Sequence, residues 1–293
     1  MTKQNNEKRS TAECYAENLR KLQRDEAALS EERDLYLRMY FSSLISAEMS
    51  FDRASKSVLG GYKRLISVSE SKSLSLDEKA ILCRVLAERY PSIPAALDSV
   101  IAGVQSAQIV LWGVHSMSSA AYERFSSLFS SVERIDVESF SEVCDFVANG
   151  TGAFGIVPLE NTTDGRLAAF YKMLDRNELR ICAVCDVEDT ETDVVTRLAL
   201  VAKNLCAFDG DFLRCIEFSL VISDVQRRIE LLGVAGKAGG TLTQLSMLPL
   251  SYRENASVDT IRLSFSKSSV YPFLMYLHLF CEDVNILGFY IQM

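Results

Sequence analysis

The chain has 293 residues, of which 48% are hydrophobic and 24% charged, with a net charge of −8 and a pI near 5.0. This balance is typical of a globular protein with a buried core, and the length allows two or three domains. The acidic charge argues against nucleic acid and against an anionic membrane as partners, because both require a basic surface. A small anionic ligand stays compatible with it, since such a ligand needs only a few local donors.

Targeting and cysteine patterns point to the cytoplasm. No stretch reaches the roughly 18 apolar residues of a membrane span, and residues 1–10 lack the apolar core of a signal peptide. The eight cysteines are too scattered for a disulfide framework, so we expect reduced thiols. Cys182 and Cys185 lie in an apolar strand that would point them to opposite faces, which favours buried thiols over a metal site. We expect no metal and no cofactor.

Residues 1–104 are predicted to be helical. A capping box at Ser10–Glu13 indicates the start of a long helix that runs to about Ser50. A second helix is expected over residues 58–66. A second capping box, Ser75–Glu78, begins a third helix, which Pro91 and Pro94 would end.

Residues 105–206 are predicted to form an α/β domain. Strand-length apolar runs at residues 109–112, 134–137, 154–159, 181–187 and 194–201 read as strands buried on both faces. Helical patterns at residues 119–129 and 139–147 separate the first three of these predicted strands. Alternation of strand and helix predicts crossover connections and a mainly parallel sheet.

Residues 207–293 change pattern again. Strands are expected at residues 215–222, 241–249, 258–266 and 284–291, with helices at residues 224–234 and 270–280. The order βαββαβ predicts a ferredoxin-like two-layer domain. The sequence as a whole thus predicts α/β plus α+β architecture behind an N-terminal helical segment.

Four segments resemble the bifunctional chorismate mutase–prephenate dehydratase family. The run Gly155-Ile-Val-Pro-Leu-Glu160-Asn161-Thr162-Thr163-Asp164-Gly165 is similar to a long family motif, with Thr162 in place of serine. Thr196-Arg197-Leu198 resembles its Thr-Arg-Phe motif, and residues 284–290 resemble its closing strand. Residues 112–119 match a family turn only at Gly113 and Ser119. The resemblance implies that the last segment is an ACT domain, a small amino-acid-binding regulatory module.

The resemblance implies a site for a small anionic metabolite of aromatic amino-acid biosynthesis, prephenate. Its implied catalytic residues are Thr196, Asn161 and Glu160, and its implied substrate-binding residues are Ser119, Thr162, Thr163, Gly165 and Arg197. Glu160 and Asn161 follow an apolar strand at its carboxyl end, where open sheets bind ligands, and Gly165 would lead into a helix start that favours an anion. The alternative interpretation is a strand end and turn in which Asn161 caps the following helix, with Arg197 an ordinary surface charge.

The spacing of these motifs raises doubt about catalysis. Thr196 follows Asn161 by only 35 residues, whereas the family places a second α/β lobe between its two motifs. We therefore expect a single lobe and weak or absent dehydratase activity. The first hypothesis is a prephenate dehydratase, with or without mutase activity, and the second is a non-catalytic, dehydratase-like binding protein.

The two flanking segments depart from the family as well. Ser246-Met-Leu-Pro249 keeps only the proline of the expected Glu-Ser-Arg-Pro motif, which makes amino-acid binding there doubtful. In the helical segment Arg20, Arg33 and Asp52-Arg53 could be remnants of a mutase pocket. Alternatively, these arginines are solvated or paired with Glu31 and Glu32. Long mutase-type helices and ACT-like sheets commonly associate, so we expect a homodimer.

Overall fold

The computed structural model describes residues 2–49, 74–89, 109–150, 153–189, 192–206, 208, 213–251, 256–266, 270–281 and 284–293. The chain divides into two compact units, Met1–Val85 and Leu86–Met293. The helix predicted over residues 58–66, the two prolines at 91 and 94, and Asp52-Arg53 lie outside the described residues. None of the described helices is both long enough and apolar enough to cross a membrane.

The first unit contains the long helix α1 (Thr2–Met49) and the start of α3 (Leu76–Arg89). The prediction that α1 begins at Ser10 is wrong, because residues 2–9 continue the helix with good helix formers such as Lys3, Gln4 and Glu7. The second capping box is confirmed. The Ser75 N–H donates to Glu78 Oε2 at 2.7 Å, and the Glu78 N–H donates to Ser75 Oγ at 3.4 Å.

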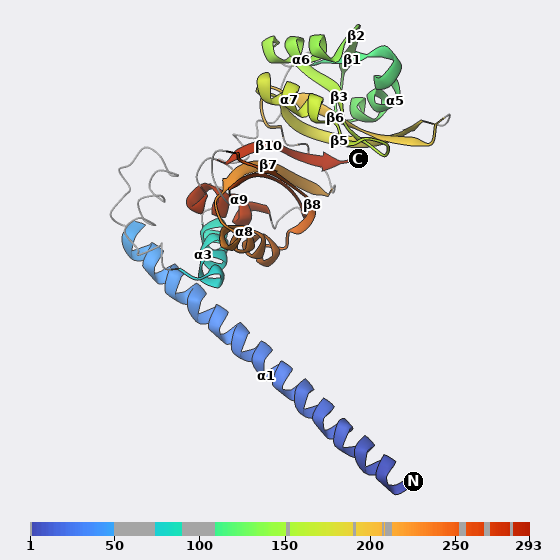
Figure 1. The fold of residues 1–293 in the computed structure, drawn as a ribbon. Helices are drawn as coiled ribbons and strands as arrows, with labels where there is room; N and C mark the ends of the chain where they lie inside the picture. The colour runs from blue at the N-terminus through green and yellow to red at the C-terminus, as the bar shows by residue number, and fades with distance from the viewer. Residues whose placement is uncertain are drawn as a thin grey trace. The chain divides into compact units, whose positions relative to one another are not determined.

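The second unit is built on one ten-stranded sheet (Figure 1). Its strands are β1 (Ile109–Val114), β2 (Val132–Val137), β3 (Ala153–Asn161), β4 (Gly165–Arg166), β5 (Arg180–Asp189), β6 (Val194–Ala202), β7 (Arg214–Ile222), β8 (Thr241–Pro249), β9 (Ser257–Phe265) and β10 (Asn285–Gln292). Its helices are α5 (His115–Ser126), α6 (Phe140–Asn149), α7 (Ala168–Arg176), α8 (Val225–Lys237) and α9 (Val270–Phe280). The strand order is β2-β1-β3-β6-β5-β10-β7-β9-β8, with β4 beside β3.

The first half of the sheet is mixed rather than mainly parallel. β2, β1 and β3 run parallel, as predicted from the helices between them. β6, however, lies antiparallel to both β3 and β5. Only residues 190–193 join β5 to β6, and so short a connection can make only an antiparallel hairpin.

The second half has the predicted element order βαββαβ, from β7 to β10. Its strands lie in the order β10-β7-β9-β8. On one face Phe273 of α9 packs against Phe218 of β7 and Phe265 of β9. Arg228 of α8 forms an ion pair with Asp259 of β9, which is fully buried.

The two halves share their hydrogen bonds. β10 closes the second half against β7 and also pairs in parallel with β5 of the first half. Gly288 makes this pair possible, since a Cβ there would lie 2.7 Å from Ile181 Cβ. The sheet therefore continues from the first half to the second through the β5–β10 pair, and the domain boundaries 1–104, 105–206 and 207–293 stay predictions.

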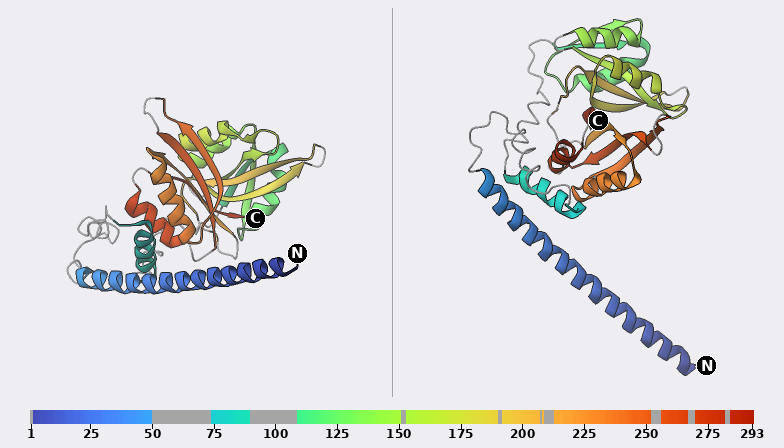
Figure 2. Two further views of the ribbon diagram at one scale, coloured as in Figure 1. Left: turned by 60° about the horizontal axis from the view of Figure 1, so that its bottom comes forward. Right: turned by 60° about the vertical axis from the view of Figure 1, so that its left-hand side comes forward.

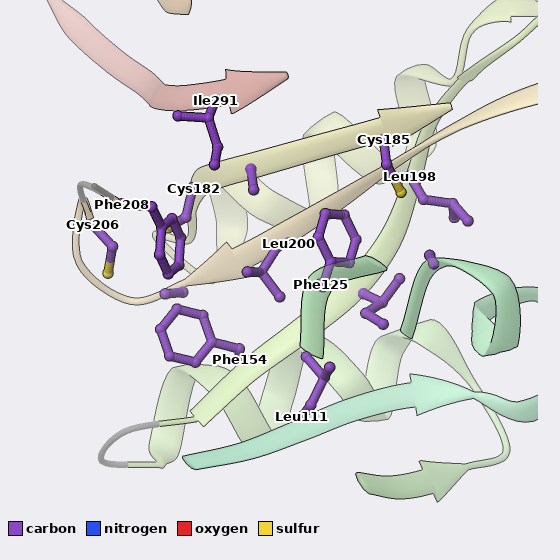
Figure 3. Packing of buried hydrophobic residues seen from close by; sticks show 14 of the residues in the cluster. Leu111, Phe125, Phe154, Cys182, Cys185, Leu198, Leu200, Cys206, Phe208 and Ile291 are labelled. Carbon is purple, nitrogen blue, oxygen red and sulfur yellow. The ribbon is translucent and has the colours of Figure 1, made fainter. Parts of the chain in front are cut away.

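Apolar cores lie on both faces of the first half of the sheet. One core gathers around Phe125 of α5 and includes Leu200, Cys182 and Cys185 (Figure 3). The other is covered by α6 and α7. The prediction that Cys182 and Cys185 point to opposite faces is wrong, because the strand register shifts between Ile181 and Ala183, and the extra residue returns both thiols to one side. Both thiols are buried, as predicted.

Candidate functional site

The predicted motif forms a tight hairpin between β3 and β4. Asn161 pairs with Gly165, whose φ of +68° is in the left-handed region that glycine adopts freely. The Asn161 side chain accepts hydrogen bonds from the N–H groups of Thr163 and Asp164, and its amide donates to Asp164 Oδ2 at 2.9 Å. The Asn161 amide therefore holds the turn, which the alternative interpretation predicted, but it does not cap a helix, which that interpretation also predicted. No helix follows Gly165 directly, since β4 intervenes before α7.

The two separate family motifs meet side by side at this hairpin. Thr196 on β6 is the cross-strand partner of Asn161. Thr162 makes two hydrogen bonds with Val195, the residue before Thr196 on β6. Its N–H donates to the Val195 carbonyl at 3.0 Å, and its hydroxyl accepts from the Val195 N–H at 3.2 Å. Within the described part of the chain the Thr196 hydroxyl makes no hydrogen bond, so it is available to a ligand.

Glu160 and Arg197 lie on the opposite face of the same strands. Glu160 and Arg197 are cross-strand partners because the register shifts between Pro158 and Glu160. Arg197 points to the same face of β6 as Ala199, which is the face covered by α6 and α7. Arg197 donates to both carboxylate oxygens of Asp186, at 2.8 and 3.1 Å, and to Glu160 at 3.4 Å. Arg197 is therefore not an ordinary surface charge, and Glu160 is separated by the sheet from Asn161 and Thr196.

Ser119 belongs to a different part of the sheet. It lies on α5, and Arg134 of β2 donates to its hydroxyl at 3.0 Å. The predicted residues thus divide into three places: Asn161, Thr162, Thr163, Gly165 and Thr196 at the hairpin, Glu160 and Arg197 on the far face, and Ser119 on α5. Their roles stay a prediction.

The far face carries a network of buried charges. Arg262 of β9 donates to Glu160 at 2.7 Å and to Glu217 at 3.0 Å. Glu217 of β7, which is fully buried, also accepts from Arg166 at 3.2 Å and from the Tyr290 hydroxyl at 3.1 Å. Such a network is stable only when every charged group has partners, and these charges are paired.

This network shows that the sheet curls strongly. β3 and β9 are separated by four other strands, which in a flat sheet would place them about 24 Å apart. The 2.7 Å hydrogen bond from Arg262 to Glu160 requires the two strands to approach within the reach of two side chains. The sheet therefore bends around a concave face, and its twisted course is visible from two further sides in Figure 2.

The electrostatics of the network keep Glu160 ionised. Burial alone would raise the pKa of Glu160, but its hydrogen bond with Arg262 and the charges of Arg262 and Arg197 outweigh burial and lower that pKa. Burial and the nearby Glu217 carboxylate raise the pKa of Tyr290 well above its ordinary value, so its hydroxyl stays protonated. The hydrogen bonds from Arg197 to Asp186 raise the pKa of Arg197 in turn.

A cavity of about 370 Å³ lies on this concave face. Its polar lining comes from both halves of the sheet: Glu160, Arg197, Thr243, Gln244, Arg262, Tyr290 and Gln292. Sequence reasoning missed Gln244, Arg262 and Tyr290. The available signal was a charged residue inside an apolar strand, as with Arg262 in Ser257–Phe265 and Glu217 in Arg214–Ile222. Such residues are buried only when they are paired or functional.

Comparison with known proteins agrees with the motif at the hairpin. Residues 114–203, less than half of the chain, match the family model of prephenate dehydratase. This region is therefore a prephenate dehydratase-family segment. A comparison with curated protein sequences found no match.

Similarity to solved structures is at the level of the fold, and it rests on the first of the three structures that follow. Prephenate dehydratase from Streptococcus mutans is 17% identical, and the match covers 63% of this chain and 98% of that one with a TM-score of 0.50. A structure titled GqqA, a novel type of quorum quenching acylase, is 17% identical over 62% of this chain and 94% of its own, with a TM-score of 0.47. Prephenate dehydratase from Arthrobacter aurescens, in complex with L-Phe, is 13% identical over 62% and 90%, with a TM-score of 0.46.

Proposed function

We propose that this prephenate dehydratase-family protein belongs to phenylalanine biosynthesis and binds a small anionic metabolite at the Asn161–Thr196 hairpin without converting prephenate at an enzymatic rate. The observation that carries the proposal is the β5–β6 hairpin. β5 and β6 pair from Arg180 with Ala202 to Asp189 with Val194, and only residues 190–193 connect them. The position at which the resemblance implies a second lobe therefore holds a connection of only four residues, 190–193.

The geometry of the hairpin explains why catalysis would be weak. Dehydration of prephenate requires an acid for the leaving hydroxyl and donors for two carboxylates, held away from water. Asn161 has already used its amide within the turn, and Thr162 and Thr163 have exposed side chains. Donors at a surface open to water contribute much less than donors in a closed pocket, because the local dielectric constant is higher.

The test is the formation of phenylpyruvate from prephenate by the purified full chain. We expect a turnover below about 0.1 per second, whereas enzymes typically reach about 1 to 1,000 per second. A turnover in that range, abolished by Thr196→Ala and retained by Thr192→Ala in the exposed β5–β6 turn, would show that the chain is a working dehydratase. Binding of prephenate without turnover supports the proposal.

The flanking segments extend the proposal. The strand order β10-β7-β9-β8 supports an ACT-like module over residues 207–293. For the helical segment, Arg33 forms an ion pair with Asp77 at 2.6 Å, not with Glu31 or Glu32, and Arg20 is exposed. These placements favour a mutase-like layout without mutase activity. A cytoplasmic homodimer completes the proposal, and a monomeric mass in sedimentation equilibrium would contradict that part of it.

A further inference from the structure

The cavity on the concave face contains an unusual acceptor. Gln244 of β8 lines this cavity together with Glu160, and hydrogen bonding from its amide nitrogen is one of the causes that lower the pKa of Glu160. The remaining oxygen, Oε1, is buried and has no hydrogen-bond partner in the described part of the chain. A buried acceptor without a partner is rare in folded proteins, because desolvation of the oxygen goes uncompensated. The site is therefore complete only when something donates to Gln244.

Two guanidinium groups, those of Arg197 and Arg262, line the same cavity. Arg197 directs three of its five N–H groups to Asp186 and Glu160, and Arg262 directs four of its five to Glu160, Glu217 and Tyr171. Each arginine therefore keeps N–H capacity that no described protein group uses. Spare guanidinium N–H groups are good partners for a carboxylate oxygen.

The charge and size of the cavity restrict the ligand further. Three carboxylates, Glu160, Asp186 and Glu217, balance the three arginines of the network, Arg166, Arg197 and Arg262. A balanced network disfavours a ligand with several negative charges. The cavity volume of about 370 Å³ suits one small molecule, and Val184, Leu213 and Cys215 give it an apolar wall.

We propose that this cavity binds a small monocarboxylate that carries a hydrogen-bond donor next to the carboxylate. The carboxylate accepts from the spare N–H groups of Arg197 and Arg262, the donor satisfies Gln244 Oε1, and an apolar substituent contacts the wall. A 2-hydroxy acid and an α-amino acid share this chemistry. The site goes beyond the ligand binding proposed for the Asn161–Thr196 hairpin, because it lies on the opposite face of the sheet from these two residues and draws half of its lining from β8, β9 and β10.

The test is calorimetric titration of the full chain with three probes: 2-hydroxy-3-phenylpropanoate, L-phenylalanine, and 3-phenylpropanoate, which lacks the donor. We expect one of the first two to bind at least tenfold more tightly than 3-phenylpropanoate, and the tighter of them identifies the donor as hydroxyl or ammonium. Gln244→Met removes the acceptor at nearly constant volume and should abolish that preference. Gln226→Met, the same change on the exposed part of α8, should retain it.

Several outcomes would overturn the proposal. Equal affinity for all three probes, no binding of any, or an unchanged preference in Gln244→Met would each do so. If Thr196→Val rather than Gln244→Met weakens binding, the ligand occupies the hairpin and not the cavity. Hydrogen exchange of the unmodified chain gives an answer even if the variant fails to fold. Ligand protection should fall on β8, β9 and β10, and protection confined to residues 161–163 would contradict the assignment. Neither result depends on prephenate turnover.

Discussion

Glu160 and Arg262 join parts of the chain that are about a hundred residues apart. Arg262 reaches Glu160 at 2.7 Å across the concave face and holds Glu217 with the same guanidinium. Burial of such charges is unfavourable unless each has a partner, and removal of one partner leaves the other uncompensated. Glu160, which the family resemblance assigns to catalysis, is thus in this structure part of a network that holds the sheet in its curled form.

Replacement of Glu160 by glutamine should destabilise the chain in a pH-dependent way. Folding lowers the pKa of Glu160. Its carboxylate therefore stabilises the folded state fully at pH values above the pKa of Glu160 in the unfolded chain, about 4.3. This stabilisation is lost as the pH falls through the lowered pKa of the folded state. We expect Glu160→Gln to reduce the free energy of unfolding by about 1–3 kcal/mol at pH 7, and the difference from the unmodified chain to shrink below about pH 4.

Urea unfolding at pH 7 and pH 3 measures this difference. Glu188→Gln, on the exposed end of β5, is the matched control and should have little effect at either pH. A loss of stability that is the same at both pH values would mean that packing, and not the charge of Glu160, is what matters at this position.

At the scale of elements, β10 is the strand that joins the two halves of the sheet. It pairs antiparallel with β7 and parallel with β5, so it belongs to both halves at once. Gly288 lies at the closest approach, where a Cβ would meet Ile181 Cβ at 2.7 Å and the Ile181 carbonyl oxygen at 2.9 Å. In the sequence Gly288 is only one residue of a family motif. The structure explains on steric grounds why a glycine is needed at this position.

Addition of one methyl group at Gly288 should weaken this junction. Gly288→Ala forces β10 away from β5, since the contacting atoms include backbone that cannot move independently. We expect a loss of about 1–3 kcal/mol in the free energy of unfolding, as for overpacking of a core. Gly236→Ala, in α8 with no atom within 4 Å of the added methyl, should be neutral or stabilising. Thermal unfolding of both variants measures these changes in stability. An unchanged unfolding midpoint for Gly288→Ala would contradict the close approach of β10 to β5.

At the scale of the whole molecule, residues 105–206 and 207–293 share one sheet and one polar network. The strand order passes from β5 to β10 without interruption, and Arg262 bonds to Glu160 across the concave face. If the second half opened by itself, β5 would lose a strand partner and Glu160 would lose its strongest donor. The two halves therefore depend on each other for stability.

We expect these two halves to unfold together in a single transition. Native-state hydrogen exchange should give similar opening free energies for the central residues of β6 in the first half and β9 in the second, because both lie inside the continuous sheet. Two values separated by more than about 2 kcal/mol would show that each half unfolds alone. In Gly288→Ala the two values should move apart, since the junction is weakened.

The sequence by itself determined which segments form strands and helices over most of the second unit. Apolar runs and capping residues are local signals, so β3, β5 and α9 could be predicted within a few residues, as could the capping box at Ser75 in the first unit. The eleven-residue motif ending at Gly165 likewise indicated the family of the segment that the family model matches. These features depend on residues that are close together in the chain.

Only the tertiary structure decided the curl of the sheet and which face each site residue occupies. A register shift of one residue next to Glu160 sets that side chain on the face of Arg197 and Arg262, away from Asn161 and Thr196. Arg262, Gln244 and Tyr290 come from strands far along the chain and meet Glu160 only because the sheet bends. Periodicity identifies a strand but carries no information on its curvature or distant neighbours, and for that physical reason the cavity could not be predicted from the sequence.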